Sequence, residues 1–307
     1  MSAVGVLESD HVLVPDPAEA NRLHNKGFFG DPQSGNSLRL SRQEAAYNVR
    51  QGRLTVEGAD FADLVDTAYF AYADLRDRGL VARHDGDGFI VWPRGQGPKD
   101  EPWFRARVMS ERDAVGSDDL EPGVLCVVDE DGGVTHYDVA EADPEGTVMA
   151  LDHAVVPGRI VQGAVLVDGD AFAREHIGAP HAEGRVLSFT EAEMLRRRGV
   201  LDVPDDLADR ARAQQHHFDR TLPVYLDLRR RGVVARSGFR FGTHLRGYGG
   251  DPDQGHAPWL IQCLDEGQRL HWSELSRAVR LAHGVRKSFL VAWGDPVQYR
   301  AVSWLRP

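Results

Sequence analysis

Three side chains near the C-terminal end of the chain are of the types needed to cut RNA without a metal ion: Tyr248, His256 and Lys287. In such a cut a 2′-hydroxyl loses a proton as it attacks phosphorus, and the leaving 5′-oxygen gains one. The extra negative charge on the phosphorus must also be stabilised. An imidazole titrates near neutral pH and suits the acid, whereas a lysine ammonium is a compact charge for phosphate oxygens.

These properties give each residue a role. We predict that His256 is the general acid, that Lys287 contacts the phosphate oxygens, and that Tyr248 is the general base. A phenol in water gives up its proton only near about pH 10, so a tyrosine base needs cationic neighbours. The candidate neighbours are Arg246 and Lys287. The expected products are a 2′,3′-cyclic phosphate and a 5′-hydroxyl.

Lysine is rare in this chain, which has 36 basic residues but only three lysines, Lys26, Lys99 and Lys287. Because arginine stands at almost every other basic position, a lysine ahead of an apolar run indicates that a compact ammonium is required there. The second half has no HxxxH pair, the two cysteines lack metal-type spacing, and GxGxxG and Walker motifs are absent. The sequence therefore predicts neither a metal nor a cofactor.

Charge is unevenly distributed along the 307 residues. The formal net charge is −11, yet Thr221–Pro307 has twelve arginines and one lysine against seven acidic residues, an excess of six positive charges. The remainder has an excess of seventeen negative charges, so only one end of the chain is suited to bind phosphate. No apolar run is long enough to span a membrane and the N-terminus lacks a secretory pattern. We therefore predict a cytoplasmic protein without a membrane partner.

The elements that must position these residues occur twice. Four blocks of the first half return in the same order in the second: HVLV (11–14) with AVLV (164–167), AYADLRDRGLVAR (71–83) with VYLDLRRRGVVAR (224–236), EPWFRARV (101–108) with APWLIQCL (257–264), and VLCVVDEDGGVTHYDV (124–139) with FLVAWGDPVQYRAV (289–302). The second pair predicts a helix followed by a strand, and the last pair is typical of hairpins. The sequence therefore predicts a tandem duplication of the α/β (α+β) class.

Each half is expected to combine a small helical or mixed N-terminal part with a mixed α/β, nuclease-like part. The first half covers residues 1–150 and the second covers 160–307, with an N-terminal part of about 160–220 and a catalytic domain of about 221–307. The segment Glu145–Arg159 is the expected connection.

Two helix starts follow from capping-box patterns, in which a hydroxyl residue is followed three positions later by Glu. One pattern is Ser41 with Glu44, and the other is Thr190 with Glu193. We predict that a helix begins at each.

The three candidate residues belong to the second half alone. Aligned on the Pro-Trp pair, His256 faces Asp100; aligned on the apolar strands, Lys287 faces Pro122. The extra residues around Tyr248 have no counterpart. Two repeats that share their scaffold residues but not their candidate catalytic residues are expected when one repeat is active and the other has only a structural role. The first half is therefore predicted to be a degenerate, catalytically inactive repeat.

A string within Leu222–Pro307, GFRFGTHLRGY…GHAPWLI…SELSRAVRLAHGVRKSFLVA, resembles the catalytic domain of the archaeal tRNA-intron (splicing) endonucleases. The shared features are a Tyr in a loop, a His ahead of a strand and a helix ending in VRK. The resemblance implies excision of introns from precursor tRNA at bulge–helix–bulge sites, recognised by shape. One class in this family fuses a degraded copy to an active one, so it also implies a homodimer of two-copy chains.

Four other residues are assigned to the substrate: Arg246, Arg280, Trp304 and Arg306. Arg280 lies seven residues before Lys287, which predicts the same face of one helix two turns earlier. In the family that this chain resembles, an arginine at this position helps to clamp a bulged base. The opposing face is expected from Trp304 or Arg306, by stacking.

Assembly is the last expectation. Cutting both bulges of one RNA needs two active sites, so two chains must associate. The acidic turn Asp129-Glu130-Asp131 is predicted to dock into a basic groove of the partner's catalytic half. Two other functions remain open: a non-catalytic RNA-binding protein, and a winged-helix-like DNA-binding protein suggested by VYLDLRRRGVVARSG.

Overall fold

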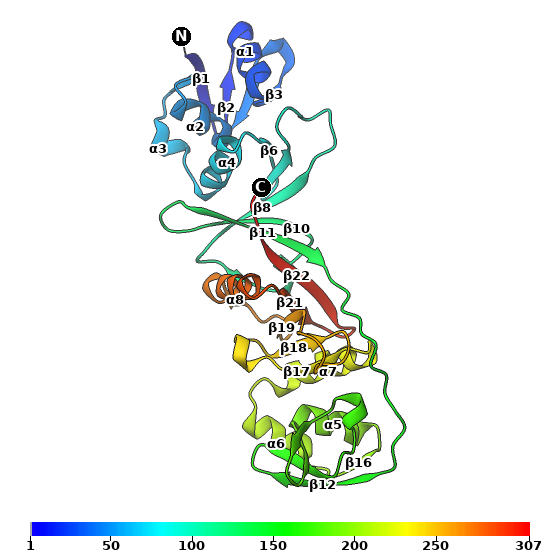
Figure 1. Cartoon of the computed structure of the whole chain (residues 1–307). Helices are drawn as coiled ribbons and strands as arrows, with labels where there is room; N and C mark the ends of the chain where they lie inside the picture. The colour runs from blue at the N-terminus through cyan, green and yellow to red at the C-terminus, as the bar shows by residue number, and fades with distance from the viewer. Residues whose placement is uncertain (1) are drawn as a thin grey trace.

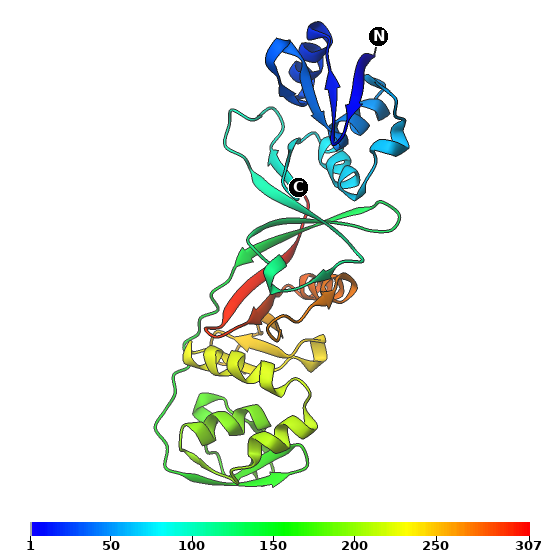
Figure 2. The ribbon, with the colours of Figure 1, turned by 180° about the vertical axis from the view of Figure 1, so that it is seen from behind.

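Residues 2–307 are described by a computed structural model, in which two small α/β units lie at opposite ends of a central sheet (Figure 1). The chain starts in one end unit, enters the central sheet, runs along the side of the molecule to the far unit, and returns to the centre (Figure 2). Within residues 2–307, no helix has the length and apolar character needed to cross a bilayer.

The first end unit is a five-stranded sheet, ordered β3-β4-β2-β1-β5, with helices packed against it. Its strands are β1 (Ala3–Glu8), β2 (His11–Val14), β3 (Asp31–Pro32), β4 (Leu38–Ser41) and β5 (Leu54–Glu57), and its helices are α1 (Pro17–Gly27), α2 (Arg42–Arg50), α3 (Phe61–Leu64) and α4 (Thr67–Asp77). Helix α4 contacts α2 on one side and the central sheet on the other, so it joins this unit to the centre.

The second end unit has a sheet of the same size, ordered β14-β15-β13-β12-β16. Its strands are β12 (Val156–Val161), β13 (Ala164–Asp168), β14 (Ala179–His181), β15 (Gly184–Leu187) and β16 (Leu201–Asp202), and its helices are α5 (Phe189–Arg197) and α6 (Leu207–Gln214). Helix α7 (Phe218–Arg230) then leads back to the central sheet, as α4 does in the first half. Because β12 begins at Val156, this unit starts a few residues before the predicted boundary at 160.

The central sheet has ten strands, ordered β17-β18-β19-β21-β22-β11-β10-β8-β7-β6. The first half supplies β6 (Val81–Asp85), β7 (Gly88–Trp92), β8 (Phe104–Ser110), β10 (Gly123–Val128) and β11 (Val134–Glu141), and the second supplies β17 (Val234–Ser237), β18 (Leu245–Tyr248), β19 (Trp259–Cys263), β21 (Ser288–Trp293) and β22 (Gln298–Leu305). The halves meet where β11 and β22 pair antiparallel, with Val139 opposite Val302. Read outward from this pair, both halves follow the same order, and β8·β10 and β19·β21 are both parallel.

One helix distinguishes the two halves of the sheet. Helix α8 (Trp272–Gly284) connects β19 to β21, whereas the corresponding stretch of the first half has only the short β9 (Ala114–Val115) and a 3-10 turn. Strand β20 (Leu270–His271) pairs with β9, and Trp272 stacks on Tyr137 of the first half with ring centroids 5.3 Å apart. The helix ahead of Lys287 is thus fixed by contacts from both halves.

The two predicted capping boxes have different outcomes. Ser41 caps α2, as predicted, with its side chain accepting from the N–H of Glu44. The prediction at Thr190 is wrong, because Ser188 caps α5 and forms the capping box with Glu191. The sequence contains two overlapping capping patterns, one at Ser188 and one at Thr190. Because β15 ends at Leu187, Ser188 is the residue that adopts the extended cap conformation.

The same buried carboxylate network occurs in each end unit. Glu44 accepts hydrogen bonds from the N–H groups of Gly30 and Ser41, and Glu191 accepts them from Gly178 and Ser188. Each half also has its own hydrophobic core, while a third cluster under α8 contains residues of both. The shared cluster makes the centre of the molecule one packed body.

Candidate active site

Two of the three candidate side chains contact Ala257, and the third belongs to the residue before it in the chain. Tyr248 ends β18 and packs against Ala257 and Val234 in a small buried cluster. His256 directly precedes Ala257 in the chain, and the Nζ of Lys287 donates a hydrogen bond to the Ala257 carbonyl. The side chains of Tyr248 and Lys287, 39 positions apart in the sequence, therefore both contact Ala257, just before β19 begins at Trp259.

The position of Lys287 depends on the end of α8. The helix ends at Gly284, Arg286 has a positive φ of 55°, and the N–H of Lys287 donates to the carbonyl of Ala282. The chain then enters β21, where Ser288 donates its N–H to Pro258 and pairs with Trp259. Because Lys287 lies beyond the helix, the prediction that it shares a helix face with Arg280 is wrong.

Tyr248 is almost buried, with 8% of its surface exposed, and it ends a strand rather than lying in a loop. The guanidinium of Arg246 lies 5.7 Å from its ring centroid, two residues earlier on the same face of β18. The hydroxyl of Tyr248 makes no hydrogen bond to any of residues 2–307. The cationic neighbour that the sequence suggested is therefore present on one side of the ring.

Lys287 has a second neighbour that the sequence did not suggest. Its Nζ lies 5.5 Å from the ring centroid of Phe241, in the short turn between β17 and β18. An aromatic face attracts an ammonium, so Phe241 and the Ala257 carbonyl together fix the charge. The only signal in the sequence is the aromatic pair in GFRFG, which has no feature that marks it as a partner for a lysine. His256 remains exposed beside this group.

Trp304 and Arg306, offered by the sequence as alternatives, lie against each other. The guanidinium of Arg306 lies 4.5 Å from the Trp304 ring centroid, and the exposed fraction of Trp304 is 39%. His283 of α8 approaches the same indole edge-on at 5.9 Å, and Arg280 is exposed one turn earlier. A cavity of about 210 Å³ lies between α8 and β22 and is lined by Lys287, His283 and Trp304. An exposed aromatic surface thus adjoins the lysine.

The acidic turn Asp129-Glu130-Asp131 is exposed, but its members differ. The Asp129 carboxylate accepts from the N–H groups of Asp131 and Gly133, at 3.1 and 2.7 Å, so Asp129 shapes the turn. The carboxylate of Glu130 lies 3.4 Å from the Arg112 guanidinium at the surface. Asp131 therefore forms no ion pair within residues 2–307, and Glu130 is held only by this exposed ion pair.

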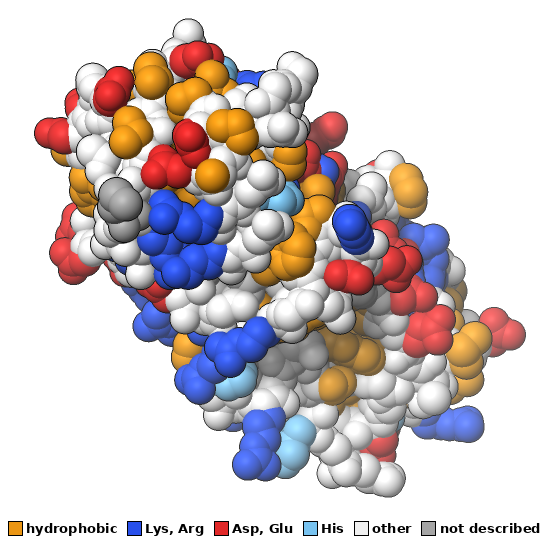
Figure 3. Space-filling model, turned by 90° about the horizontal axis from the view of Figure 1, so that it is seen from above, with side chains coloured by type: hydrophobic (Ala, Val, Ile, Leu, Met, Phe, Trp, Pro, Cys, Tyr) orange, Lys and Arg blue, Asp and Glu red, His pale blue; other side chains and the backbone are white. Residues whose placement is uncertain are grey.

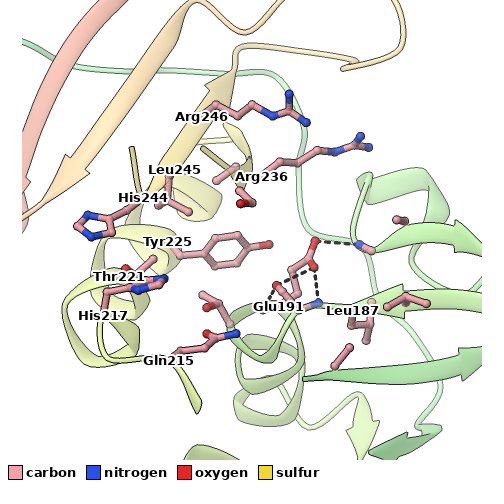
Figure 4. A pocket seen from close by; sticks show the side chains of 18 residues that line it. Leu187, Glu191, Gln215, His217, Thr221, Tyr225, Arg236, His244, Leu245 and Arg246 are labelled. Atoms are coloured by element: carbon pink, nitrogen blue, oxygen red, sulfur yellow. Dashed lines mark hydrogen bonds between the residues drawn. The ribbon is translucent and has the colours of Figure 1, made fainter. Parts of the chain in front are cut away.

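A cavity of about 440 Å³ separates the second end unit from the edge of the central sheet (Figure 4). Arg236 and Arg246 stand opposite each other on β17 and β18 and both line it. Tyr225 points into it, with a buried hydroxyl that has no partner within residues 2–307, and burial raises the pKa of Tyr225. The one carboxylate here, Glu191, accepts hydrogen bonds from Gly178 and Ser188. The cavity is therefore cationic.

The corresponding place in the first half has its charge neutralised. Arg83, which aligns with Arg236, forms an ion pair with Asp31 and lies 3.7 Å from Glu44. In the second half Ala179 stands where Asp31 would be, so Arg236 forms no ion pair with any of residues 2–307.

Unpaired arginines are concentrated near the C-terminus. Nine arginines follow Arg231, and among residues 2–307 only Arg269 of these pairs with carboxylates, those of Asp118 and Asp119. Viewed from the end that carries the first unit, the molecule instead shows intermixed acidic and basic side chains (Figure 3). The positive excess of the second half is thus available to phosphates.

One group of potential metal ligands was not anticipated. His176, Asp251 and Asp253 place ligand atoms within 4.8 Å of one another, with His176 Nδ1 lying 3.6 Å from the Asp251 carboxylate. Nothing in the sequence indicates this group, because His176 belongs to the second end unit and the aspartates to the segment between Tyr248 and His256. Only the packing of the two units brings them together.

Comparison with known proteins gives a consistent result. Residues 3–66 match the family described as "tRNA intron endonuclease, N-terminal domain", and residues 218–299 match "tRNA intron endonuclease, catalytic C-terminal domain". The chain is 34% identical to a tRNA-splicing endonuclease of Halobacterium salinarum, with 99% of each chain covered. It is 35% identical to one of Natronomonas pharaonis (97% of this chain, 98% of that one) and 30% identical to one of Methanococcoides burtonii (97% and 98%).

Proposed function

The chain belongs to the tRNA-splicing endonuclease family and is a tRNA-intron endonuclease, and from this premise we propose that it cuts precursor tRNA at bulge–helix–bulge sites. The cut is metal-independent and leaves a 2′,3′-cyclic phosphate and a 5′-hydroxyl. The observation that carries the proposal is that Tyr248 and Lys287 both contact Ala257, the residue that directly follows His256. A base, an acid and a cation around one point are the groups that such a reaction requires.

Each side chain acts according to its surroundings. His256 is exposed and can reach the leaving 5′-oxygen of a bound RNA, to which it gives a proton. An ammonium has three N–H donors, so Lys287 keeps two for phosphate oxygens while one holds Ala257. Tyr248 takes the proton of the 2′-hydroxyl, with the Arg246 guanidinium 5.7 Å from its ring centroid.

We also propose that the chain is a tandem duplication with an inactive first half. Support comes from the shared strand order and from the matching networks of Glu44 and Glu191. The sequence alignment left Tyr248 without a counterpart, but strand register supplies one: Trp92 faces Val81 as Tyr248 faces Val234. The indole N–H of Trp92 donates to the carbonyl of Asp100, which stands where His256 would be, so an indole and a carboxylate replace the phenol and the imidazole in the first half.

The bulged base is held beside the lysine. Arg280 supplies one face of the clamp and Trp304 the other, with Arg306 stacked behind the indole. The arrangement suits an unpaired base, because planar cations and aromatic rings stack on its faces. His283, edge-on to Trp304, holds the indole in place.

The working assembly is a homodimer. We assign the cationic cavity of Arg236 and Arg246 as the site that receives Glu130 and Asp131 from the partner's first half. Two unpaired guanidiniums and a buried hydroxyl without a partner suit two carboxylates. A two-fold axis then uses each turn and each cavity once per chain and sets the spacing of the two active sites.

The test is incubation with an intron-containing precursor tRNA in excess EDTA, followed by analysis of the RNA ends. Excision with cyclic phosphate and 5′-hydroxyl ends supports the proposal. Binding without cleavage would instead favour the RNA- or DNA-binding alternatives. A Lys287→Arg variant should be slow, whereas Lys99→Arg, the same change at an exposed lysine of the first half, should cut normally.

A further inference from the structure

The connector between the halves, Ala142–Val155, makes backbone hydrogen bonds to the second half. It runs beside the catalytic part of the second half on its way from β11 to β12 (Figures 1 and 2). Gly146 and Val148 donate their N–H groups to the carbonyls of Arg231 and Gly232, at 2.9 and 3.0 Å. Between them, the N–H of Thr147 donates to the carbonyl of Gly249 at 2.9 Å. Because Gly249 directly follows Tyr248, the connector is bonded to the backbone beside the candidate base.

Glycine at position 146 allows a very close approach. A Cβ there would lie 2.3 Å from the carbonyl oxygen of Gly232, which is inside van der Waals contact. The opposing position, Gly232, would have its own Cβ 2.5 Å from the oxygen of Gly146. Any side chain at position 146 must therefore move the connector away from the end of α7.

Val148, two residues after Gly146, extends these contacts to the candidate active site. Val148 packs against the buried cluster of Tyr248, Val234 and Ala257. Ala257 is also the residue whose carbonyl accepts the hydrogen bond of Lys287. The connector thus packs against the cluster that contains Tyr248 and Ala257, the residue that also accepts the hydrogen bond of the lysine.

Both ends of this segment are anchored. Asp143 forms an ion pair with Arg231, and further along the N–H of Leu151 donates to the carboxylate of Glu175 at 3.1 Å. Glu175 is fully buried and also binds His153 and Arg198. Anchors on either side hold Gly146–Val148 against Tyr248 instead of leaving the segment free.

We propose that Gly146, Thr147 and Val148 are positioning residues for Tyr248, so that the peptide joining the two halves contributes to catalysis. The proposal rests on the role of Tyr248 given above. It provides a reason for fusion of the inactive half to the active one: a residue that packs against the cluster around the base comes from the joining peptide. Displacing a catalytic group by about 1 Å can cost as much as about 100-fold in rate.

The experiment is a double-mutant cycle between Val148→Ala and Tyr248→Phe, read as single-turnover cleavage of precursor tRNA by the full-length protein. Val148→Ala should slow cleavage about 10-fold, with RNA affinity and the melting temperature nearly unchanged. In the Tyr248→Phe background it should cause no further loss, because the group that it positions is already gone. Val148→Ile should keep the wild-type rate, and Gly146→Ala should be slower than Val148→Ala.

Val155→Ala is the matched control, since Val155 lies in the same connector but is 63% exposed; it should cut normally. An equal loss from Val148→Ala in both backgrounds would show that the connector acts through general stability and would overturn the proposal, as would a wild-type rate for Val148→Ala. A fully active Tyr248→Phe enzyme would overturn the assignment of the base together with the positioning role.

Discussion

Neutralising Glu130 and Asp131, the two carboxylates of the acidic turn proposed to meet the partner, should dissociate the dimer. The appropriate change is Glu130→Gln with Asp131→Asn, leaving Asp129 in place because its carboxylate holds the N–H groups of Asp131 and Gly133. The reciprocal change is Arg236→Gln in the proposed receiving cavity. Arg246 is left unchanged, because it also neighbours the Tyr248 ring.

The expected size of the effect follows from the geometry of the cavity. Removing one partner of a desolvated, hydrogen-bonded charge pair costs about 2–5 kcal/mol. A two-fold dimer makes the contact twice, so independent contacts would lose about 4–10 kcal/mol in all. The dissociation constant should then rise by a factor of about 10³–10⁷. Even the lower limit would convert a nanomolar dimer into one that is largely dissociated below micromolar concentration.

Sedimentation equilibrium over a range of protein concentrations measures this constant directly. Paired cleavage at both bulges should fall together with dimerisation, while circular dichroism stays unchanged. The control is Glu57→Gln with Glu101→Gln, which removes two exposed carboxylates of the first half that form no ion pair within residues 2–307. If the turn variant stays dimeric at nanomolar concentration and still excises introns, the turn is a surface loop and the assignment of the cavity is wrong.

The remaining predictions concern chemistry and pH. Cleavage should persist in excess EDTA, and a rate that collapses in chelator and returns with Mg²⁺ would refute the Tyr, His and Lys mechanism and direct attention to His176. His256→Ala should slow cleavage by about 10²–10⁴, and a 5′-thio leaving group, which departs without protonation, should restore the rate. Lys287→Arg should lose about 10²–10³ in rate, the usual cost of removing a donor to a developing anion, with folding retained; normal activity would reduce Lys287 to a general electrostatic role. Burial lowers the pKa of His244 to about 4, so its contribution to stability is complete above about pH 6.5 and is lost as pH falls toward 4. Urea unfolding at pH 7.5 and 4.5 should show at most about 3 kcal/mol of this loss in wild type, and His244→Asn should lack it.

The sequence by itself determined the order of elements and the identity of the candidate residues. Helices and strands follow from local patterns, because their hydrogen bonds join residues close in the chain or in adjacent strands. The block at Ala71–Arg83 and its partner at Val224–Arg236 accordingly fold as helix and strand in both halves. Comparing the halves then singled out Tyr248, His256 and Lys287, since a duplicated scaffold makes unshared residues visible.

Local patterns were insufficient where two of them competed or where a helix ended. Thr190 and Ser188 both fit a capping box, and the end of the preceding strand decided between them. The spacing of Arg280 and Lys287 suggested one helix face, but α8 ends at Gly284 and a positive φ at Arg286 turns the chain away. The position at which a helix ends depends on the pairing of the strand that follows it, and this pairing is a tertiary contact.

Only the tertiary structure decided which distant groups surround the candidate residues. Phe241 beneath Lys287 and Val148 behind Tyr248 are ordinary apolar residues in the sequence, and nothing in their spacing marks them. Arg236 lacks the ion pair that Arg83 forms with Asp31, because Ala179, far away in the chain, stands at the position that corresponds to Asp31. Burial and ion pairing depend on how separate elements pack, and local sequence patterns do not specify that packing.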